Sequence, residues 1–276
     1  MPGHIANRGL STQSQKETSA NAIGKMATAT NANGEKMPTD GKEPSLAILI
    51  DADNTSARYA RAIFEEIAKL GEANVRRIYG DFSGDRLKGW RDVIQPLAIV
   101  PQQQFNYTTG KNAADITLVI DAMDLMHRRG LDGFCLVSSD SDFTRLAQRL
   151  REDGATVYGF GAKKTPEPFR NACTRFIYIE NLMDLSQDKQ DQAEQQITSK
   201  KALPSKAVPL IRKAMEQAWD EEDWVDLAVV GHRLSNLAPD FDPRTYGCDK
   251  LLTVVEKSGK FLVERPSGRG VRIKRR

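Results

Sequence analysis

Short apolar runs alternate with amphipathic segments from Ser45 to about residue 183, and this alternation constrains the fold more than any other feature of the chain. It is typical of βα units, whose strands pair in parallel because a helix carries the chain back across the sheet. Strands are expected at Leu46–Ile50, Val75–Tyr79, Leu97–Val100, Phe134–Ser138, Thr156–Phe160 and Phe176–Ile179. Helices are expected between them, at residues 56–70, 84–94, 113–129, 142–152 and 166–172. The pattern predicts an α/β domain with a doubly wound, mostly parallel sheet over residues 45–183.

Two segments lack this alternation. Residues 1–44 are rich in Ser, Thr, Asn, Gly and Lys, and residues 184–201 are rich in Gln, Asp and Lys. Neither contains enough apolar surface to offset the entropy lost on ordering. We expect a disordered leader in the first segment. In the second we expect a flexible linker, with an exposed helix as the alternative.

Residues 202–276 have a different pattern, in which predicted helices come first and two strands follow. This pattern predicts a second, smaller α+β domain. Helices are expected at residues 204–218, 225–237 and 248–257, with a turn of helix from Pro243 and strands at 260–264 and 270–274. Asp242 supports the turn, because its carboxylate suits an N-cap and Pro243 suits the first helical position. Helices followed by a β-hairpin predict a winged-helix-like arrangement.

Composition excludes several classes of site. The three cysteines and three histidines lie far apart, which argues against a disulfide framework and against a metal site built on Cys or His. No apolar run approaches the roughly 20 residues that span a bilayer, and the N-terminus has no apolar signal core. The net charge of +3 identifies no partner. We expect a cytoplasmic protein with no membrane partner, in which carboxylates carry any metal chemistry.

Acidic residues gather at three places in the first domain. Asp51 and Asp53 follow the first predicted strand, and Asp140 and Asp142 follow the fourth. Asp115 lies in the first turn of the predicted helix 113–129. Two strand ends and one helix start can meet at the carboxyl edge of a parallel sheet, where open α/β sheets place their ligands.

Carboxylates gathered in one cleft raise one another's pKa unless a divalent cation lies among them. Oxygen ligands without His or Cys favour Mg²⁺ or Mn²⁺, which can activate water and neutralise charge on a phosphodiester. Each acid also has a simpler explanation, since Asp115 suits a helix N-terminus and Asp140 or Asp142 suits an N-cap. Asp51, Asp115 and Asp140 together favour a metal site.

The stretch Asp51-Ala-Asp53-Asn54-Thr55 also matches Asp-x-Asp-x-Thr, the signature of haloacid-dehalogenase-type phosphatases. In that interpretation Asp51 is a nucleophile that accepts a phosphoryl group. It leaves Asp115 unexplained, and Ser56 stands where those phosphatases usually have a hydrophobic residue. We therefore prefer Asp51 as a metal ligand.

Three blocks, "ILIDADN", "KNAADITLVIDAMD" and "LVSSDSDFTRLAQRLREDGATVYGFG", resemble the NYN family of PIN-like nucleases over residues 45–182. The resemblance implies a PIN-like fold and Mg²⁺- or Mn²⁺-dependent action on RNA. It implies that Asp51, Asp115 and Asp140 bind the metal and act in catalysis. It further implies that Asp142 and Asp121 are additional ligands or water-positioning groups, and that Asn54 orients Asp51 or contacts substrate.

The segments "PDFDPRTYGCDKLLTVVE" and "FLVE" resemble the LOTUS domain, also called OST-HTH, over most of residues 203–276. Such domains bind RNA or protein partners, so the resemblance leaves open a homodimer or a protein partner. Basic side chains near both domains could contact phosphates or could simply be solvated surface charges. The candidates for substrate binding are Lys111, Lys163, Lys164, Arg170, Arg269, Arg272 and Lys274, together with Asn54.

These patterns lead to one functional hypothesis, a metal-dependent ribonuclease that cuts single-stranded or unpaired RNA recruited by its C-terminal domain. The alternative is a non-catalytic RNA-binding or scaffold protein with the same folds, because function resides in the site and not in the fold.

Overall fold

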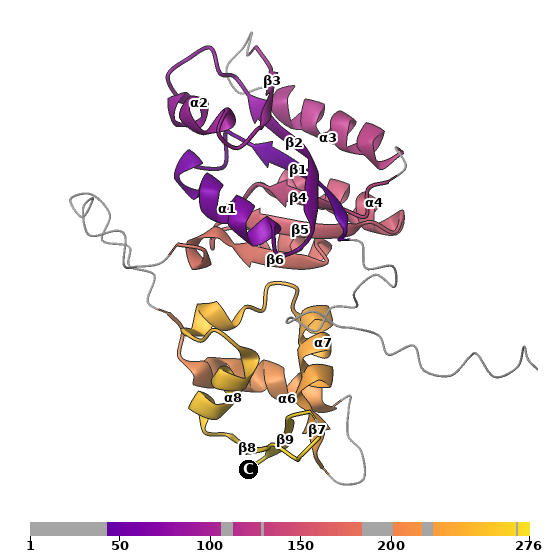
Figure 1. The fold of residues 1–276 in the computed structure, drawn as a ribbon, viewed down its shortest axis with the longest axis vertical. Helices are drawn as coiled ribbons and strands as arrows, with labels where there is room; N and C mark the ends of the chain where they lie inside the picture. Colours follow the sequence, from indigo (N-terminus) through magenta and orange to yellow (C-terminus); the bar gives the residue numbers. More distant parts are fainter. Residues whose placement is uncertain (1–42, 106–112, 128–129, 184–200, 217–222, 269) are drawn as a thin grey trace, which may run out of the picture. The chain divides into compact units, whose positions relative to one another are not determined.

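The structure is a computed structural model that describes residues 43–105, 113–127, 130–183, 201–216, 223–268 and 270–276 (Figure 1). Nearly all of the predicted leader (1–44) and linker (184–201) lies outside the described residues. Within the described ranges, no helix combines the length and the apolar character needed to cross a membrane.

A six-stranded sheet forms the centre of the first domain. Its strands are β1 (Ser45–Asp51), β2 (Glu72–Gly80), β3 (Val100–Gln103), β4 (Gly133–Val137), β5 (Thr156–Gly161) and β6 (Arg175–Tyr178). They lie in the order β3-β2-β1-β4-β5-β6, and every neighbouring pair is parallel. The first strand, β1, lies in the middle of the sheet. Strands β2 and β3 follow on one side of it and β4, β5 and β6 on the other, so the strand order reverses between β1 and β4. The predicted doubly wound α/β fold is confirmed.

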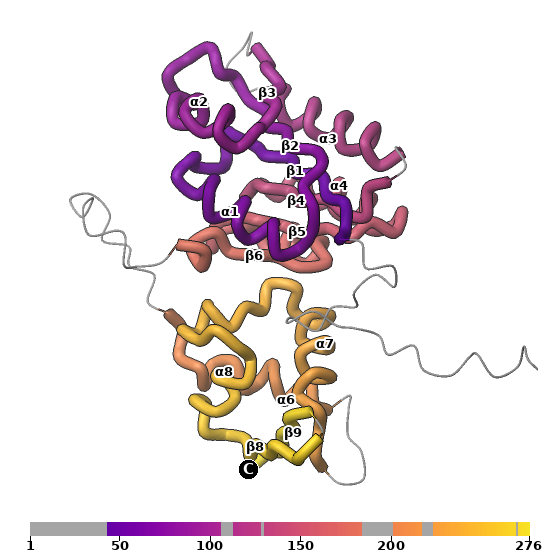
Figure 2. The backbone as a smooth tube through the Cα atoms, in the orientation of Figure 1, coloured from indigo at the N-terminus to yellow at the C-terminus, as the bar shows by residue number. Residues whose placement is uncertain are grey.

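Helices cover both faces of the sheet (Figures 1 and 2). One face packs against α1 (Ala60–Ile67) and α2 (Lys88–Ile94), and the other against α3 (Ala113–Met126), α4 (Thr144–Glu152) and α5 (Glu167–Ala172). Alternate side chains of β1 point to opposite faces, with Ile48 and Ile50 in the first core and Ala47 and Leu49 in the second. A strand buried on both sides is apolar without alternation, which explains why its sequence was recognisable. Short 3₁₀ turns add η1 (Ala57–Tyr59), η2 (Ser141–Phe143) and η3 (Ile179–Asn181).

One strand lies three residues later than predicted. Residues 97–99, expected at the start of a strand, instead form the turn that leaves α2, with Ala98 at a φ of +50° and the Ile99 N–H donating to the Ile94 carbonyl. Strand β3 is at the edge of the sheet, where Pro101 is tolerated because one side of the backbone needs no partner. Apolar Ile99, which packs into the core from the turn, made the earlier segment look like the strand.

The second domain has its own core around Ile211, Val230, Val255, Phe261 and Ile273. Its elements are η4 (Pro204–Ala207), α6 (Val208–Glu216), β7 (Val225–Asp226), α7 (Leu227–Leu237), η5 (Pro243–Tyr246), α8 (Leu251–Ser258), β8 (Phe261–Glu264) and β9 (Arg272–Arg275). The hairpin β8–β9 is extended by β7 into an antiparallel sheet of order β7-β9-β8. The predicted small α+β domain is present, and β7 is an addition to it.

Candidate functional site

The first group of acids lies where β1 and β4 end side by side. Ile50 pairs with Val137, so Asp51 at the end of β1 lies beside Ser138, which follows β4. Asp140 is the N-cap of η2, and its Oδ1 accepts the Asp142 N–H at 2.9 Å. This is the point at which the strand order reverses, the usual ligand site of an open α/β sheet.

Asp51 is almost completely buried, with 1% of its surface exposed, and its carboxylate is fixed by several donors. Ser138 Oγ donates to Oδ2 at 2.7 Å, and Asn54 Nδ2 donates to the same oxygen at 2.8 Å. The backbone N–H groups of Asp53 and Asn54 donate to Oδ1 at 3.1 and 3.2 Å. Burial raises the pKa of Asp51, and the hydrogen bonds from Ser138 and Asn54 oppose that rise. The predicted role of Asn54 in orienting Asp51 agrees with this geometry.

Asp115, in the first turn of α3, faces the same group of acids. Its pKa is raised to about 6, first by burial and then by the negative charges of Asp51, Asp140, Asp53 and Asp142. These charges come from the neighbouring ends of β1 and β4, and α3 packs against β1. The fold therefore places the predicted residues Asp51, Asp115, Asp140 and Asp142 at one edge of the sheet, together with Asp53.

Among the described residues, no three Asp, Glu, His or Cys side chains are close enough together to form a ready-made metal shell. The donor set still fits a hard divalent cation, because it consists of carboxylate oxygens without His or Cys. The raised pKa of Asp115 also reflects mutual repulsion that a cation among the carboxylates would relieve.

Asp121 does not join this group. Tyr79 OH donates to its Oδ2 at 2.6 Å, and Arg77 Nη1 lies 2.5 Å from its Oδ1. Asp121 therefore has a cationic partner on β2, against which α3 packs, and it is not among the carboxylates whose charge raises the pKa of Asp115. We correct the prediction that Asp121 is a metal ligand, and assign it to holding α3 on the sheet.

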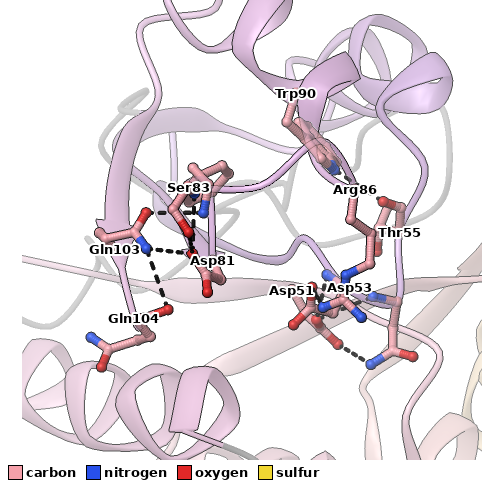
Figure 3. A network of polar contacts seen from close by, with 11 residues as sticks. Asp51, Asp53, Thr55, Asp81, Ser83, Arg86, Trp90, Gln103 and Gln104 are labelled. Atoms are coloured by element: carbon pink, nitrogen blue, oxygen red, sulfur yellow. Dashed lines mark hydrogen bonds and ion pairs between the residues drawn. The ribbon is translucent and has the colours of Figure 1, made fainter. Parts of the chain in front are cut away.

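Sequence reasoning missed Asp81, which follows β2 as Asp51 ends β1. The signal was the one used for Asp51, an acid directly after a strand. Gln103 Nε2 donates to Asp81 Oδ1 at 2.8 Å, and Ser83 Oγ donates to the same oxygen at 2.5 Å. Figure 3 shows this second polar cluster apart from Asp51 and Asp53. Its hydrogen bonds join the ends of β2 and β3.

A pocket of about 620 Å³ adjoins the acids on the side of α2. Asp53 and Asn54 line it, as do Arg58, Arg86 and Lys164. Arg86 forms an ion pair with Asp53, and Trp90 Nε1 donates to the Thr55 carbonyl at 3.0 Å (Figure 3). Of the predicted phosphate contacts, Lys164 thus lies beside the site, whereas sequence reasoning missed Arg58 and Arg86.

The other predicted phosphate contacts lie elsewhere. Lys163 follows β5, and its backbone N–H donates to Glu180. Arg272 and Lys274 lie two residues apart on β9, and Lys274 is 3.2 Å from Asp223. Lys111 and Arg269 lie outside the described residues.

Arg170 has a different role from the predicted one. Its guanidinium pairs with Asp240 of the second domain and donates to Tyr178 OH at 2.6 Å, while Tyr178 OH donates to Asp240 at 2.6 Å. Burial and then the bond to Asp240 raise the pKa of Tyr178, which keeps its hydroxyl protonated. Arg170 therefore holds the loop before η5 against β6, and we withdraw it as a phosphate contact.

A second set of contacts with the first domain involves η5 and the loop before it. Arg244 donates to both oxygens of Glu66, at 2.9 and 3.2 Å, and also to Asp242. Glu66 and Asp242 are each only 6% exposed. The Phe176 N–H donates to the Pro239 carbonyl at 2.8 Å, which satisfies a backbone group on edge strand β6. We call residues 239–245 the docking loop.

Replacing Asp115 with Asn is expected to stabilise the metal-free protein at neutral pH. Because the folded-state pKa of Asp115 is raised to about 6, its ionisation costs stability as pH rises from about 4 through 6. Allowing for solvent screening of a half-buried group, the gain is about 1 kcal/mol at pH 7.5, or a melting temperature higher by about 2–4 °C. It should vanish at pH 4. Thermal unfolding in EDTA at both pH values tests this, with exposed Asp124→Asn as the control on the same helix; equal shifts in both variants would contradict it.

Comparison with known proteins finds two domain families that match the chain. The NYN domain family matches residues 45–180, and the OST-HTH/LOTUS domain family matches residues 198–273. A solved structure of a protein of unknown function from Vibrio parahaemolyticus is 19% identical, covers 53% of this chain and 99% of its own, and has a TM-score of 0.45. An uncharacterised protein from Nitrosomonas europaea is 29% identical, covers 34% of this chain and 92% of its own, and has a TM-score of 0.25. No curated protein matches the chain.

Proposed function

We propose that the chain, which joins an NYN domain to an OST-HTH/LOTUS domain, is a metal-dependent ribonuclease. The NYN domain belongs to the PIN-like nuclease superfamily. Its substrate is single-stranded or locally unpaired RNA, and its reaction is phosphodiester hydrolysis without a covalent intermediate. One observation carries this proposal: acids from two neighbouring strand ends and the first turn of α3 share one edge of the sheet, where burial, and after it the charges of Asp51, Asp140, Asp53 and Asp142, raise the pKa of Asp115 to about 6.

In this proposal Asp51, Asp115 and Asp140 hold Mg²⁺ or Mn²⁺. When bound, the cation lowers the pKa of water and neutralises the charge that develops on the scissile phosphate. Ser138 and Asn54 keep Asp51 in one orientation, so no reorganisation is needed as substrate arrives. Asp142 is exposed beside Asp140, where its carboxylate can accept a proton from the attacking water.

The C-terminal domain recruits the RNA in this account. Its hairpin carries basic side chains, including Arg272 and Lys274, that can neutralise backbone phosphates. The ion pair of Lys274 with exposed Asp223 is weak and can exchange for a phosphate. The docking loop keeps this domain against β6 while it binds RNA.

The alternative is an RNA-binding protein without catalysis. The lack of a ready-made metal shell among the described residues favours it. A protein without catalysis has no need for the buried carboxylate of Asp51, which Ser138 and Asn54 hold in place. Nor does this alternative explain why the charge of Asp51 acts on Asp115 together with those of other acids. Unlike the ribonuclease, such a protein would bind RNA equally well with or without metal and never cut it.

Incubation of end-labelled single-stranded RNA with the full chain in Mg²⁺, Mn²⁺, Ca²⁺ or EDTA tests the proposal. We expect cleavage in Mg²⁺ or Mn²⁺ and none in EDTA, with a base-paired duplex of the same sequence cut more slowly. Binding of RNA without cleavage in every metal would support the non-catalytic alternative.

A further inference from the structure

The pocket beside the acids has the charge of a phosphate site. Three cationic side chains line it, Arg58, Arg86 and Lys164, against the single carboxylate of Asp53. They come from three separate segments, namely η1, the loop before α2 and the loop after β5. Such convergence on one cavity is not expected of scattered solvated charges. An anion is the ligand that fits it.

The existing ion pair between Arg86 and Asp53 does not prevent anion binding. The Arg86 side chain is 68% exposed and that of Asp53 is 24% exposed, so the pair is screened by water. Exposed pairs contribute little to stability. A phosphate, with more charge and two oxygens for the guanidinium fork, can replace Asp53 as the partner of Arg86.

The rest of the pocket suits a nucleotide. Its volume of about 620 Å³ lies within the usual range for small-ligand pockets and is too small for a duplex. Ala57, Leu87 and Gly89 give it an apolar wall, against which a ribose or the face of a base can lie. Trp90 is anchored to Thr55 behind them.

We infer that this pocket binds the nucleotide next to the scissile phosphate of a single RNA strand. Arg86 and Lys164 contact its phosphate, and Arg58 adds a third positive charge to the same pocket. The inference rests on the proposed function, because Asp53 both lines the pocket and adds its charge to those around Asp115. The pocket thus places the strand so that its next phosphate reaches Asp51 and Asp140.

The test measures RNA affinity separately from cleavage. Fluorescence anisotropy with a labelled RNA of about six nucleotides is recorded at several salt concentrations, using the full chain with Asp140→Asn so that RNA is not cut. Adding Arg86→Gln or Lys164→Gln should weaken RNA binding about 3- to 10-fold. It should also reduce the slope of log affinity against log salt concentration by about one. Arg149→Gln is the matched control, since Arg149 is also exposed and paired with an Asp but lies on α4 outside the pocket.

The outcomes separate the possibilities. The inference would be overturned if both pocket variants bound RNA with the affinity and salt dependence of the Asp140→Asn protein. It would also be overturned if Arg149→Gln lost as much RNA affinity as the pocket variants. Binding of millimolar inorganic phosphate that Arg86→Gln abolishes, with RNA affinity unchanged in the same variant, would assign the pocket to free phosphate and also overturn the inference. If the wild type never cuts RNA but the pocket variants lose affinity as expected, the nuclease proposal fails and the RNA pocket stands. Arg86→Lys, which keeps the charge without the fork, should bind with intermediate affinity and guards against a misfolded Gln variant.

Discussion

Replacing Asp51 with Asn is expected to slow metal-dependent RNA cleavage by about 10³-fold or more. Asp51 is buried and accepts hydrogen bonds from Ser138, Asn54 and two backbone N–H groups, so no neighbouring side chain can take its place. Losing one carboxylate ligand removes several kcal/mol of charge stabilisation from the transition state, which corresponds to this factor. The initial rate of cleavage of labelled single-stranded RNA in saturating Mn²⁺ measures the effect.

Asp124→Asn is the control for this variant. Asp124 is exposed on α3 and plays no part in the proposed site, so its substitution should leave the cleavage rate within about twofold. RNA affinity measured in EDTA should be the same or slightly higher for Asp51→Asn, because the change removes a negative charge near the substrate. A cleavage rate for Asp51→Asn within tenfold of wild type would contradict the assignment of Asp51 as a ligand.

Replacing Arg244 with Ala is expected to destabilise the protein by about 3 kcal/mol. The change leaves the carboxylates of Glu66 and Asp242 buried without their main partner, and removing one member of a buried pair carries this order of cost. Chemical denaturation of wild type and variant at pH 7 measures the difference in the free energy of unfolding. Arg265→Ala is the control, because Arg265 forms an exposed pair with Glu256 that should contribute less than about 1 kcal/mol.

The pH dependence of the Arg244 effect has a definite sign. Burial would raise the pKa of Glu66, but the hydrogen bonds from Arg244 and Lys69 outweigh burial and hold it below its usual value of 4.5. The contribution of this pair is therefore present above pH 4.5 and is lost as pH falls through the depressed pKa. The difference between wild type and Arg244→Ala should shrink as pH falls below 4.5.

A charge exchange tests whether this contact joins the two domains. Glu66→Arg and Arg244→Glu should each be destabilising alone, and the double variant should recover part of the loss. The absence of any recovery would mean that each residue acts within its own domain. Recovery would confirm that the docking loop holds the C-terminal domain on the first.

The parts of the fold that could be predicted are those whose burial leaves a mark in the sequence. Strand β1 is covered on both faces, so Leu46 to Ile50 form an unbroken apolar run. Strand β3 at the edge of the sheet is short and polar, and contains Pro101, Gln102 and Gln103. Its position depends on pairing with β2, which no local pattern records.

The site could be predicted to a similar extent. The positions of Asp51, Asp115 and Asp140 at one edge of the sheet could be predicted because strand ends and a helix start are readable in the sequence, whereas their role as ligands stays a prediction. Asp121 is six residues along α3 from Asp115, and a helix turns about 100° per residue, so geometry alone places it on another side. The family resemblance nevertheless suggested it as a ligand, and the bonds to Arg77 and Tyr79 show otherwise.

Arg170 could not have been assigned from the sequence. Its partner Asp240 lies 70 residues further along the chain, in the other domain. A basic residue near a predicted phosphate edge looks the same whether it meets RNA or another part of the protein. Arg86, in contrast, was not predicted as a phosphate contact but lies beside Asp53. It belongs to a loop with no recognisable motif, so the sequence did not indicate its position.

In the proposed ribonuclease, Asp51, Asp115 and Asp140 hold a catalytic divalent metal. The most direct test is single-turnover cleavage of labelled single-stranded RNA by wild type and Asp140→Asn across a range of Mn²⁺ concentrations, with RNA affinity measured in parallel. We expect Mn²⁺-dependent cleavage by the wild type, and near-absent cleavage by Asp140→Asn with its fold and RNA affinity retained. Cleavage by the wild type in EDTA, equal cleavage by both proteins, or RNA binding by both without cleavage in any metal would contradict it.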